Sequence, residues 1–128
     1  MYKTNMEYVN EIVGKVVKGL GIGEMISYPT INVQSDNIDL EFGVFACAVR
    51  VNEKEFKGAM HYGPRKVVSD EKPSLEVFLF DFNGDLYNQD VTIKVYGKIR
   101  DTRDFEDLME LKVQIKEDVE EVRKFFKK

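Results

Sequence analysis

The feature that most constrains the fold is a two-residue alternation of side chains, which recurs along most of the chain and then stops. In residues 74–82, Leu75, Val77 and Leu79 fall on one side, and residues 91–99 alternate in the same way. A period of two places successive side chains on opposite faces of a β-strand. Further β-prone runs are bounded by Gly, Pro and Asn, which mark turns. The expected strands are residues 11–18, 28–33, 43–51, 54–60, 74–82 and 91–99.

The last segment changes to a helical period. Its apolar residues recur at steps of three or four, which is one stripe of an amphipathic helix. The stripe consists of Phe105, Leu108, Leu111, Ile115, Val119, Val122 and Phe126. About six short strands joined by tight turns favour a small antiparallel barrel, closed to remove its edges, with this helix across one end. The predicted class is therefore mainly β.

The composition fits one domain, residues 1–128, with 43% hydrophobic residues to fill a core. The net charge of −4 argues against a nucleic-acid partner, because phosphate binding favours a basic face. The start of the chain has no apolar core typical of a secretory signal, and no apolar run approaches the ~20 residues of a membrane span. We expect a cytoplasmic monomer that contacts no membrane. The single cysteine, Cys47, lies in an apolar run and is expected to be buried and inert.

A glycine cluster, Gly19, Gly21 and Gly23, follows the first expected strand. Backbone without Cβ atoms can approach a phosphate closely and direct N–H groups at it. The cluster lacks the Gly-Lys-Ser/Thr of a Walker A loop, and no helical pattern continues from it as in a Rossmann fingerprint. A flexible turn and a phosphate cradle both remain open.

Pro29-Thr30-x-Asn32 lies a few residues downstream. On an extended chain, residues two apart point to the same side, so the hydroxyl and the amide oxygen would be neighbours. Such neutral oxygens suit Mg²⁺ that is already held by phosphates. The alternative is a turn followed by a strand-edge cap.

Glu76 is an acidic residue in an apolar strand, on the same side as Phe78 and Phe80. A carboxylate beside aromatic rings is either solvated on an outer face or held as a general base for a hydroxyl nucleophile. His61, the only histidine, has no cysteine partners and is a poor candidate for a metal ligand.

Taken in order, these motifs resemble the riboflavin kinase family, known alone or as the C-terminal half of bacterial bifunctional FAD synthetases. The resemblance covers about residues 12–126. The matching pieces are Val13-Gly14-Lys15-Val16-Val17-Lys18-Gly19-x-Gly21-x-Gly23, Pro29-Thr30-x-Asn32-Val33, Gly43-Val44-Phe45, residues 75–82, Asp85-Leu86-Tyr87, Ile99-Arg100-Asp101-x-Arg103-x-Phe105, Leu108, Leu111, Gln114-Ile115 and Asp118.

The resemblance implies a six-stranded antiparallel Greek-key barrel with a C-terminal helix. It implies an ATP:riboflavin 5′-phosphotransferase that makes FMN and ADP, with Mg²⁺ bound beside ATP. Gly19, Gly21, Gly23, Thr30 and Asn32 would bind the nucleotide, and Thr30 and Asn32 would also contact the metal. Glu76 would take the proton of the ribityl 5′-hydroxyl. The isoalloxazine ring would lie against Arg100, Phe105, Leu108 and Leu111.

Two positions depart from the family pattern. Ser27 stands where the family usually has a glycine, and Gly63-Pro64-Arg65-Lys66-Val67-Val68 replaces a Pro-Thr-Phe that follows the central glycine. These departures keep open the alternative of a non-catalytic flavin- or nucleotide-binding module. A further alternative, a barrel of unrelated function such as a protein-interaction module, would require the order of the motifs to be chance. A chain of this length has no room for an adenylyltransferase domain, so we expect the activity to stop at FMN.

Overall fold

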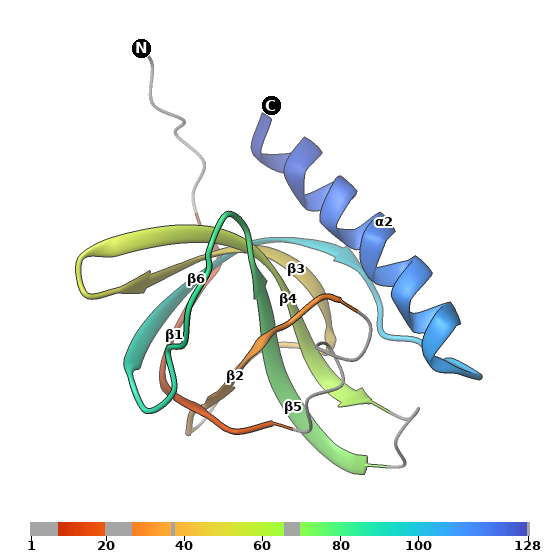
Figure 1. Cartoon of the computed structure of the whole chain (residues 1–128), viewed down its shortest axis with the longest axis horizontal. Helices are drawn as coiled ribbons and strands as arrows, with labels where there is room; N and C mark the ends of the chain where they lie inside the picture. The colour runs from red at the N-terminus through yellow and green to blue at the C-terminus, as the bar shows by residue number, and fades with distance from the viewer. Residues whose placement is uncertain (1–7, 20–26, 37, 66–69, 128) are drawn as a thin grey trace.

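The computed structural model describes residues 8–19, 27–36, 38–65 and 70–127 (Figure 1). Six strands precede one long helix. The elements are β1 (Asn10–Val17), β2 (Ile31–Gln34), β3 (Gly43–Val51), β4 (Lys54–Arg65), β5 (Asp70–Leu79), β6 (Asp90–Arg100) and α2 (Leu108–Lys127). The predicted β3 is confirmed residue for residue. The predicted β2 is too long, because Tyr28 to Thr30 lie before the strand and only four residues pair.

The six strands close into one barrel in the order β1-β2-β5-β4-β3-β6, and every neighbouring pair is antiparallel. Strands β3, β4 and β5 form a meander, and β6 returns to lie beside β3, which is the Greek-key arrangement. Closure leaves no open edge for pairing with another chain. The fold implied by the resemblance is therefore confirmed.

The β3–β4 hairpin shows how local sequence sets the strand register. Its two turn residues, Asn52 and Glu53, have positive φ angles of 50° and 69°. A two-residue turn with two positive φ angles matches the right-handed twist of the strands it joins. The hairpin then pairs continuously from Val51–Lys54 to Gly43–Tyr62.

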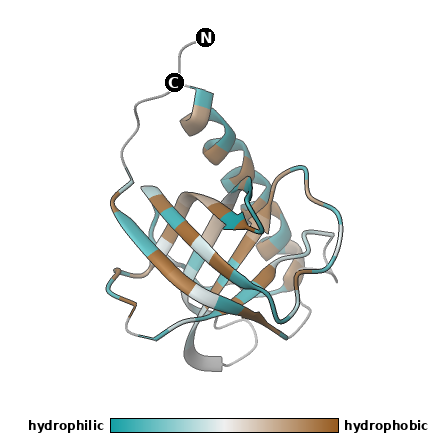
Figure 2. Cartoon of the chain, turned by 90° about the vertical axis from the view of Figure 1, so that its left-hand side faces the viewer, coloured by the Kyte–Doolittle hydropathy of each residue, from teal (hydrophilic) through white to brown (hydrophobic). Residues whose placement is uncertain are grey.

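The barrel interior holds the main core, and alternating residues of each strand point into it. The hydropathy pattern of the strands shows this alternation directly (Figure 2). On β5, Leu75, Val77 and Leu79 are buried, as the period of two predicts. Cys47 is fully buried, as expected, and burial raises the pKa of its thiol. A raised pKa keeps the thiol protonated and unreactive at neutral pH.

A second, smaller core lies outside the barrel wall and under α2. Ala46 on β3, Phe80 just after β5 and Val122 on α2 are buried there. The helix therefore packs along the outer wall (Figure 1), and the expectation that it crosses one end of the barrel is wrong. The physical reason is that the outer face of residues 74–82 carries Phe78 and Phe80, an apolar surface that must be covered.

The N-terminus of α2 begins at a capping residue. Asp107 Oδ1 accepts a hydrogen bond of 2.9 Å from the backbone N–H of Glu110, which satisfies one of the free donors of the first turn. This cap explains why the helix begins at Leu108 although the apolar stripe begins at Phe105. In the described part of the chain, no helix is long and apolar enough to cross a membrane.

Candidate active site

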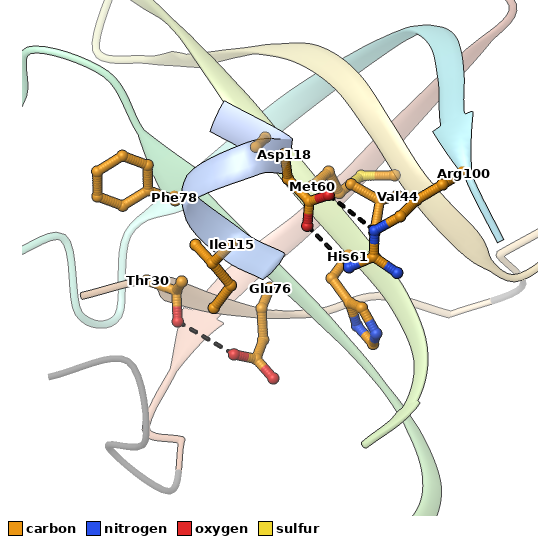
Figure 3. Close-up of a pocket in the computed structure, with 10 residues that line it drawn as sticks. Thr30, Val44, Met60, His61, Glu76, Phe78, Arg100, Ile115 and Asp118 are labelled. Atoms are coloured by element: carbon orange, nitrogen blue, oxygen red, sulfur yellow. Dashed lines mark hydrogen bonds and ion pairs between the residues drawn. The ribbon is translucent and has the colours of Figure 1, made fainter. Parts of the chain in front are cut away.

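A pocket opens between the outer barrel wall and the first half of α2 (Figure 3). Its empty volume is about 380 Å³, part of which is continuous with solvent. Residues from the four neighbouring strands β5, β4, β3 and β6, from the segment before β2 and from the helix line it, so its walls come from segments far apart in the sequence. The lining residues are Thr30, Val44, Ala59, Met60, His61, Glu76, Phe78, Arg100, Ile115 and Asp118.

Glu76 lies in this pocket, half-buried on the outward face of β5. The Thr30 hydroxyl donates to Oε1 across 3.1 Å, and the Ser74 hydroxyl donates to Oε2 across 3.2 Å. Each carboxylate oxygen thus has one hydroxyl donor that fixes its direction. Of the two alternatives left by the sequence, the structure supports a held carboxylate over one that is solvated on an open face.

The segment before β2 brings Thr30 to Glu76. The Tyr28 ring packs edge-on against Phe78 with centroids 5.4 Å apart, which anchors this segment on β5. Asn32 then pairs with Glu76 in the β2–β5 register, so both side chains point to the outer face of the barrel. Thr30 and Asn32 are therefore both neighbours of Glu76.

Gly19 lies against the other side of Asn32. A Cβ atom at Gly19 would overlap the side-chain amide of Asn32 in its present position, so glycine allows this close approach without moving Asn32. Gly21 and Gly23 lie outside the described residues. Gly19, Thr30 and Asn32 therefore belong to one corner of the site, next to the carboxylate of Glu76.

The donor set in this corner fits a magnesium ion that is also bound by phosphate. Thr30 and Asn32 offer one hydroxyl and one amide oxygen, which are neutral, hard ligands. Among the described residues, no group of three or more His, Cys, Asp or Glu is placed to hold a metal. Two neutral oxygens hold such an ion weakly by themselves, so phosphate oxygens would have to supply most of its ligands.

The opposite wall of the pocket is an ion pair between β6 and α2. Arg100 Nε lies 2.7 Å from Asp118 Oδ1, and its Nη2 lies 2.8 Å from Oδ2 (Figure 3). Gln114 also donates to Oδ1 across 3.1 Å. The Asp118 side chain is only 7% exposed, and this two-point pairing satisfies both of its oxygens. Arg100 thus holds the helix to the barrel beside the pocket.

The other three residues that the resemblance assigned to the flavin lie along the start of α2. Phe105 and Leu108 are half-buried, and the Arg103 guanidinium lies over the Phe105 ring at 4.7 Å. Leu111 is only 1% exposed and offers almost no surface to a ligand. Of these three residues, only Phe105 and Leu108 therefore keep accessible apolar surface.

Sequence reasoning assigned no role to two residues of this site, Ser74 and Asp118, and discounted a third. Ser74 stands two residues before Glu76, so the strand period already placed their side chains on one face. Asp118 falls on the apolar stripe of the helix, three residues after Ile115, and a carboxylate there needs a partner. His61 was discounted as a metal ligand, yet it lines the pocket directly across from Glu76 in the β4–β5 pairing.

Both departures from the family pattern affect backbone geometry. Ser27 has a φ of 69°, a left-handed conformation that glycine adopts without strain. Gly63 has a φ of 146°, and a Cβ there would press on Thr102 and Phe42. Gly63 is thus fixed beside its pairing partner Ser74 on β5, and residues 66–69 after it lie outside the described part of the chain.

Fold and site together define a class of Greek-key barrel protein. Beside its pocket lie a carboxylate that is fixed by hydrogen bonds and a Thr-x-Asn segment that a glycine approaches closely. Such a site suits proton transfer and phosphate binding on a small substrate. The chain belongs to the riboflavin kinase family: the profile of the flavokinase family, described as riboflavin kinase, matches residues 6–126.

Similar proteins carry the same family name. The chain is 38% identical over 116 residues to the RNA-binding riboflavin kinase RibR of Bacillus subtilis, covering 90% of this chain and 50% of that protein. It is 37% identical over 117 residues to the bifunctional riboflavin kinase/FMN adenylyltransferase of Haemophilus influenzae, covering 90% of this chain and 38% of that protein. The chain thus spans half or less of the length of these curated relatives.

A solved structure described as a macrolide-efflux protein from Streptococcus pneumoniae has the same fold. It superposes with a TM-score of 0.78 at 30% sequence identity, covering 88% of this chain and 38% of that one.

Proposed function

We propose that this chain is an ATP:riboflavin 5′-phosphotransferase, which forms FMN and ADP. The observation that carries the proposal is the placement of Glu76, held by the Thr30 hydroxyl at 3.1 Å and paired in register with Asn32. A base, two neutral oxygen ligands and a close-approach glycine meet at one corner. Phosphoryl transfer needs this combination, because catalysis rests on positioning and on charge neutralisation.

In this proposal Glu76 accepts the proton of the ribityl 5′-hydroxyl as the hydroxyl oxygen attacks the γ-phosphorus. The bond from that phosphorus to the bridging oxygen breaks, and ADP leaves with the electron pair. Gly19, together with Gly21 and Gly23, offers backbone N–H groups to the phosphates. Mg²⁺ held by Thr30, Asn32 and phosphate oxygens would neutralise phosphate charge.

The segment of residues 100–111 is proposed to cover the flavin ring. Phe105 and Leu108 are half-buried and supply the apolar contact surface. Leu111 is buried and Arg100 is engaged by Asp118, so both would act by holding this segment in place. We further propose that the protein acts as a cytoplasmic monomer and without a nucleic-acid partner.

The second candidate function is a non-catalytic flavin- or nucleotide-binding module. It is disfavoured because such a module has no use for a carboxylate with a hydroxyl donor on each oxygen. The two candidates differ in whether FMN is formed from riboflavin.

The test is an assay of the purified chain with riboflavin, ATP and Mg²⁺, in which FMN is separated by chromatography. FMN that forms with Mg²⁺ and stops on adding a chelator supports the kinase. Riboflavin binding without FMN would support the binding module, and neither binding nor turnover would reject both.

A further inference from the structure

Ser74 is the second hydroxyl on Glu76, and nothing in the assigned chemistry uses it. It lies on β5, two residues before Glu76, and donates to Oε2 across 3.2 Å. Its own pairing partner on β4 is Gly63. The Ser74 side chain is half-buried and lies on the same face of β5 as Glu76.

Ser74 has a second acceptor within reach, because the carbonyl oxygen of Gly63 lies 3.5 Å from the Ser74 hydroxyl oxygen. A hydroxyl has one proton to donate and can rotate it, and its oxygen can accept at the same time. Ser74 can therefore donate to Glu76 in one state and to Gly63 in the other.

The second acceptor is fixed in place by its surroundings. Gly63 sits where the β4–β5 register shifts, and its bare Cα packs against Phe42 and Thr102. The Phe42 ring also packs edge-on against Tyr62, with centroids 5.3 Å apart. The carbonyl that faces Ser74 thus belongs to a packed corner.

We propose that Ser74 is a positioning residue for Glu76. The Ser74 hydroxyl turns from hydrogen-bond donor to acceptor when Glu76 takes up a proton. This inference rests on the proposed function, in which Glu76 accepts the proton of the substrate hydroxyl. Before transfer, Ser74 donates to ionised Oε2. After transfer, the new O–H of Glu76 donates to the Ser74 oxygen, and the Ser74 proton turns to the Gly63 carbonyl.

The proton balance of this step is complete. The substrate O–H bond breaks, the Oε2–H bond forms, and the Ser74 O–H bond only rotates. Oε1 keeps its donor Thr30 throughout, so the two carboxylate oxygens have different tasks. In both protonation states each oxygen of Glu76 then keeps a hydrogen-bond partner, which avoids the cost of an unsatisfied polar group.

The test compares Ser74→Thr with Ser74→Val, two β-branched side chains of similar shape that both suit a strand. The threonine variant should keep kcat within a few-fold of wild type. The valine variant should lower kcat by about 10-fold, with riboflavin KM and riboflavin binding nearly unchanged. Ser74→Ala should behave as the valine variant does and serves if valine impairs folding.

The matched control is Ser35→Ala. The Ser35 hydroxyl donates to the backbone carbonyl of Val13 across 2.6 Å, away from the pocket. Loss of the Ser35 hydroxyl should lower the free energy of unfolding but leave kcat unchanged. A Ser74→Val variant that raises KM alone, or that matches the threonine variant in kcat, would overturn the positioning role.

A double variant separates this inference from the proposed function. In a Glu76→Gln background, Ser74→Val should cost no further activity, because the group that it positions is gone. An equal loss in both backgrounds would overturn the Ser74 inference alone. Wild-type kcat in Glu76→Gln itself would instead overturn the proposed mechanism, whatever Ser74 does.

Discussion

The hydroxyl of Thr30 donates to Oε1 of Glu76 across 3.1 Å, although the two residues are 46 positions apart in the sequence. The contact exists because β2 and β5 are neighbours in the closed barrel. It joins the proposed metal and phosphate corner to the proposed base, so a change at Thr30 should affect both.

Thr30→Val removes the hydroxyl with little change in shape. We expect kcat/KM for Mg·ATP to fall by about 10- to 100-fold, the scale for losing a hydrogen bond to a charged group. Asn32→Leu should act in the same direction, and both variants should remain folded. Thr92→Val on β6, outside the pocket, is the control. Near-normal turnover of both site variants at limiting Mg²⁺ would remove these residues from the metal corner.

The Arg100–Asp118 ion pair should be a stability element. Asp118→Ala leaves the guanidinium, 19% exposed, without its two-point partner, and we expect a loss of about 3 kcal/mol in the free energy of unfolding. The double change Arg100→Met and Asp118→Leu should cost less, because no charge is then left unpaired. Urea unfolding measures both. A double variant less stable than the single one would contradict this account.

Lys98 joins Glu41 and Asp101 across 2.5 Å each, which ties the segment before β3 to the segment before α2. The Lys98 hydrogen bond lowers the pKa of Asp101, and hydrogen bonds to Asp101 and Glu41 raise the pKa of Lys98. A lowered acidic pKa adds stability that is lost as pH falls through the folded value. A raised lysine pKa adds stability that is lost as pH rises through it.

Lys98→Met should therefore lower the melting temperature at neutral pH, with a difference that shrinks in acid and in high salt. Lys116→Met, at an exposed position of α2, is the control. Thermal melts at pH 7 and at acidic pH measure the effect. A difference that persists in acid would mean that the lysine acts through packing.

Ser27 adopts a left-handed backbone with a φ of 69°. Ser27→Gly should raise the free energy of unfolding by about 1 kcal/mol, because glycine adopts this φ without strain. Ser27→Val should lower it, since a β-branched residue is poorly tolerated at positive φ. Denaturant unfolding of the two variants should move in opposite directions. Equal stability of both would show that this backbone position carries no strain.

The sequence indicated the strands, the helix and the pieces of the site, because each has a local signal. Alternation placed Leu75, Val77 and Leu79 inside the barrel and Glu76 outside it. Local signals do not report which strands pair, so the meeting of Thr30 with Glu76 and of Arg100 with Asp118 needed the closed barrel. The predicted position of α2 was wrong because Phe78 and Phe80 were considered only as neighbours of Glu76. These outer aromatic side chains also need to be buried, and α2 packs over them.

The most direct test of the central claim is the kcat of Glu76→Gln with riboflavin and Mg·ATP. Glutamine keeps the size of the side chain and most of its hydrogen bonding but accepts no proton at neutral pH. We expect riboflavin binding within a few-fold of wild type and a kcat lower by about 10²-fold or more, the scale for losing a general base. A variant that is folded, binds riboflavin and turns over at the wild-type rate would contradict the assignment of Glu76 as the base.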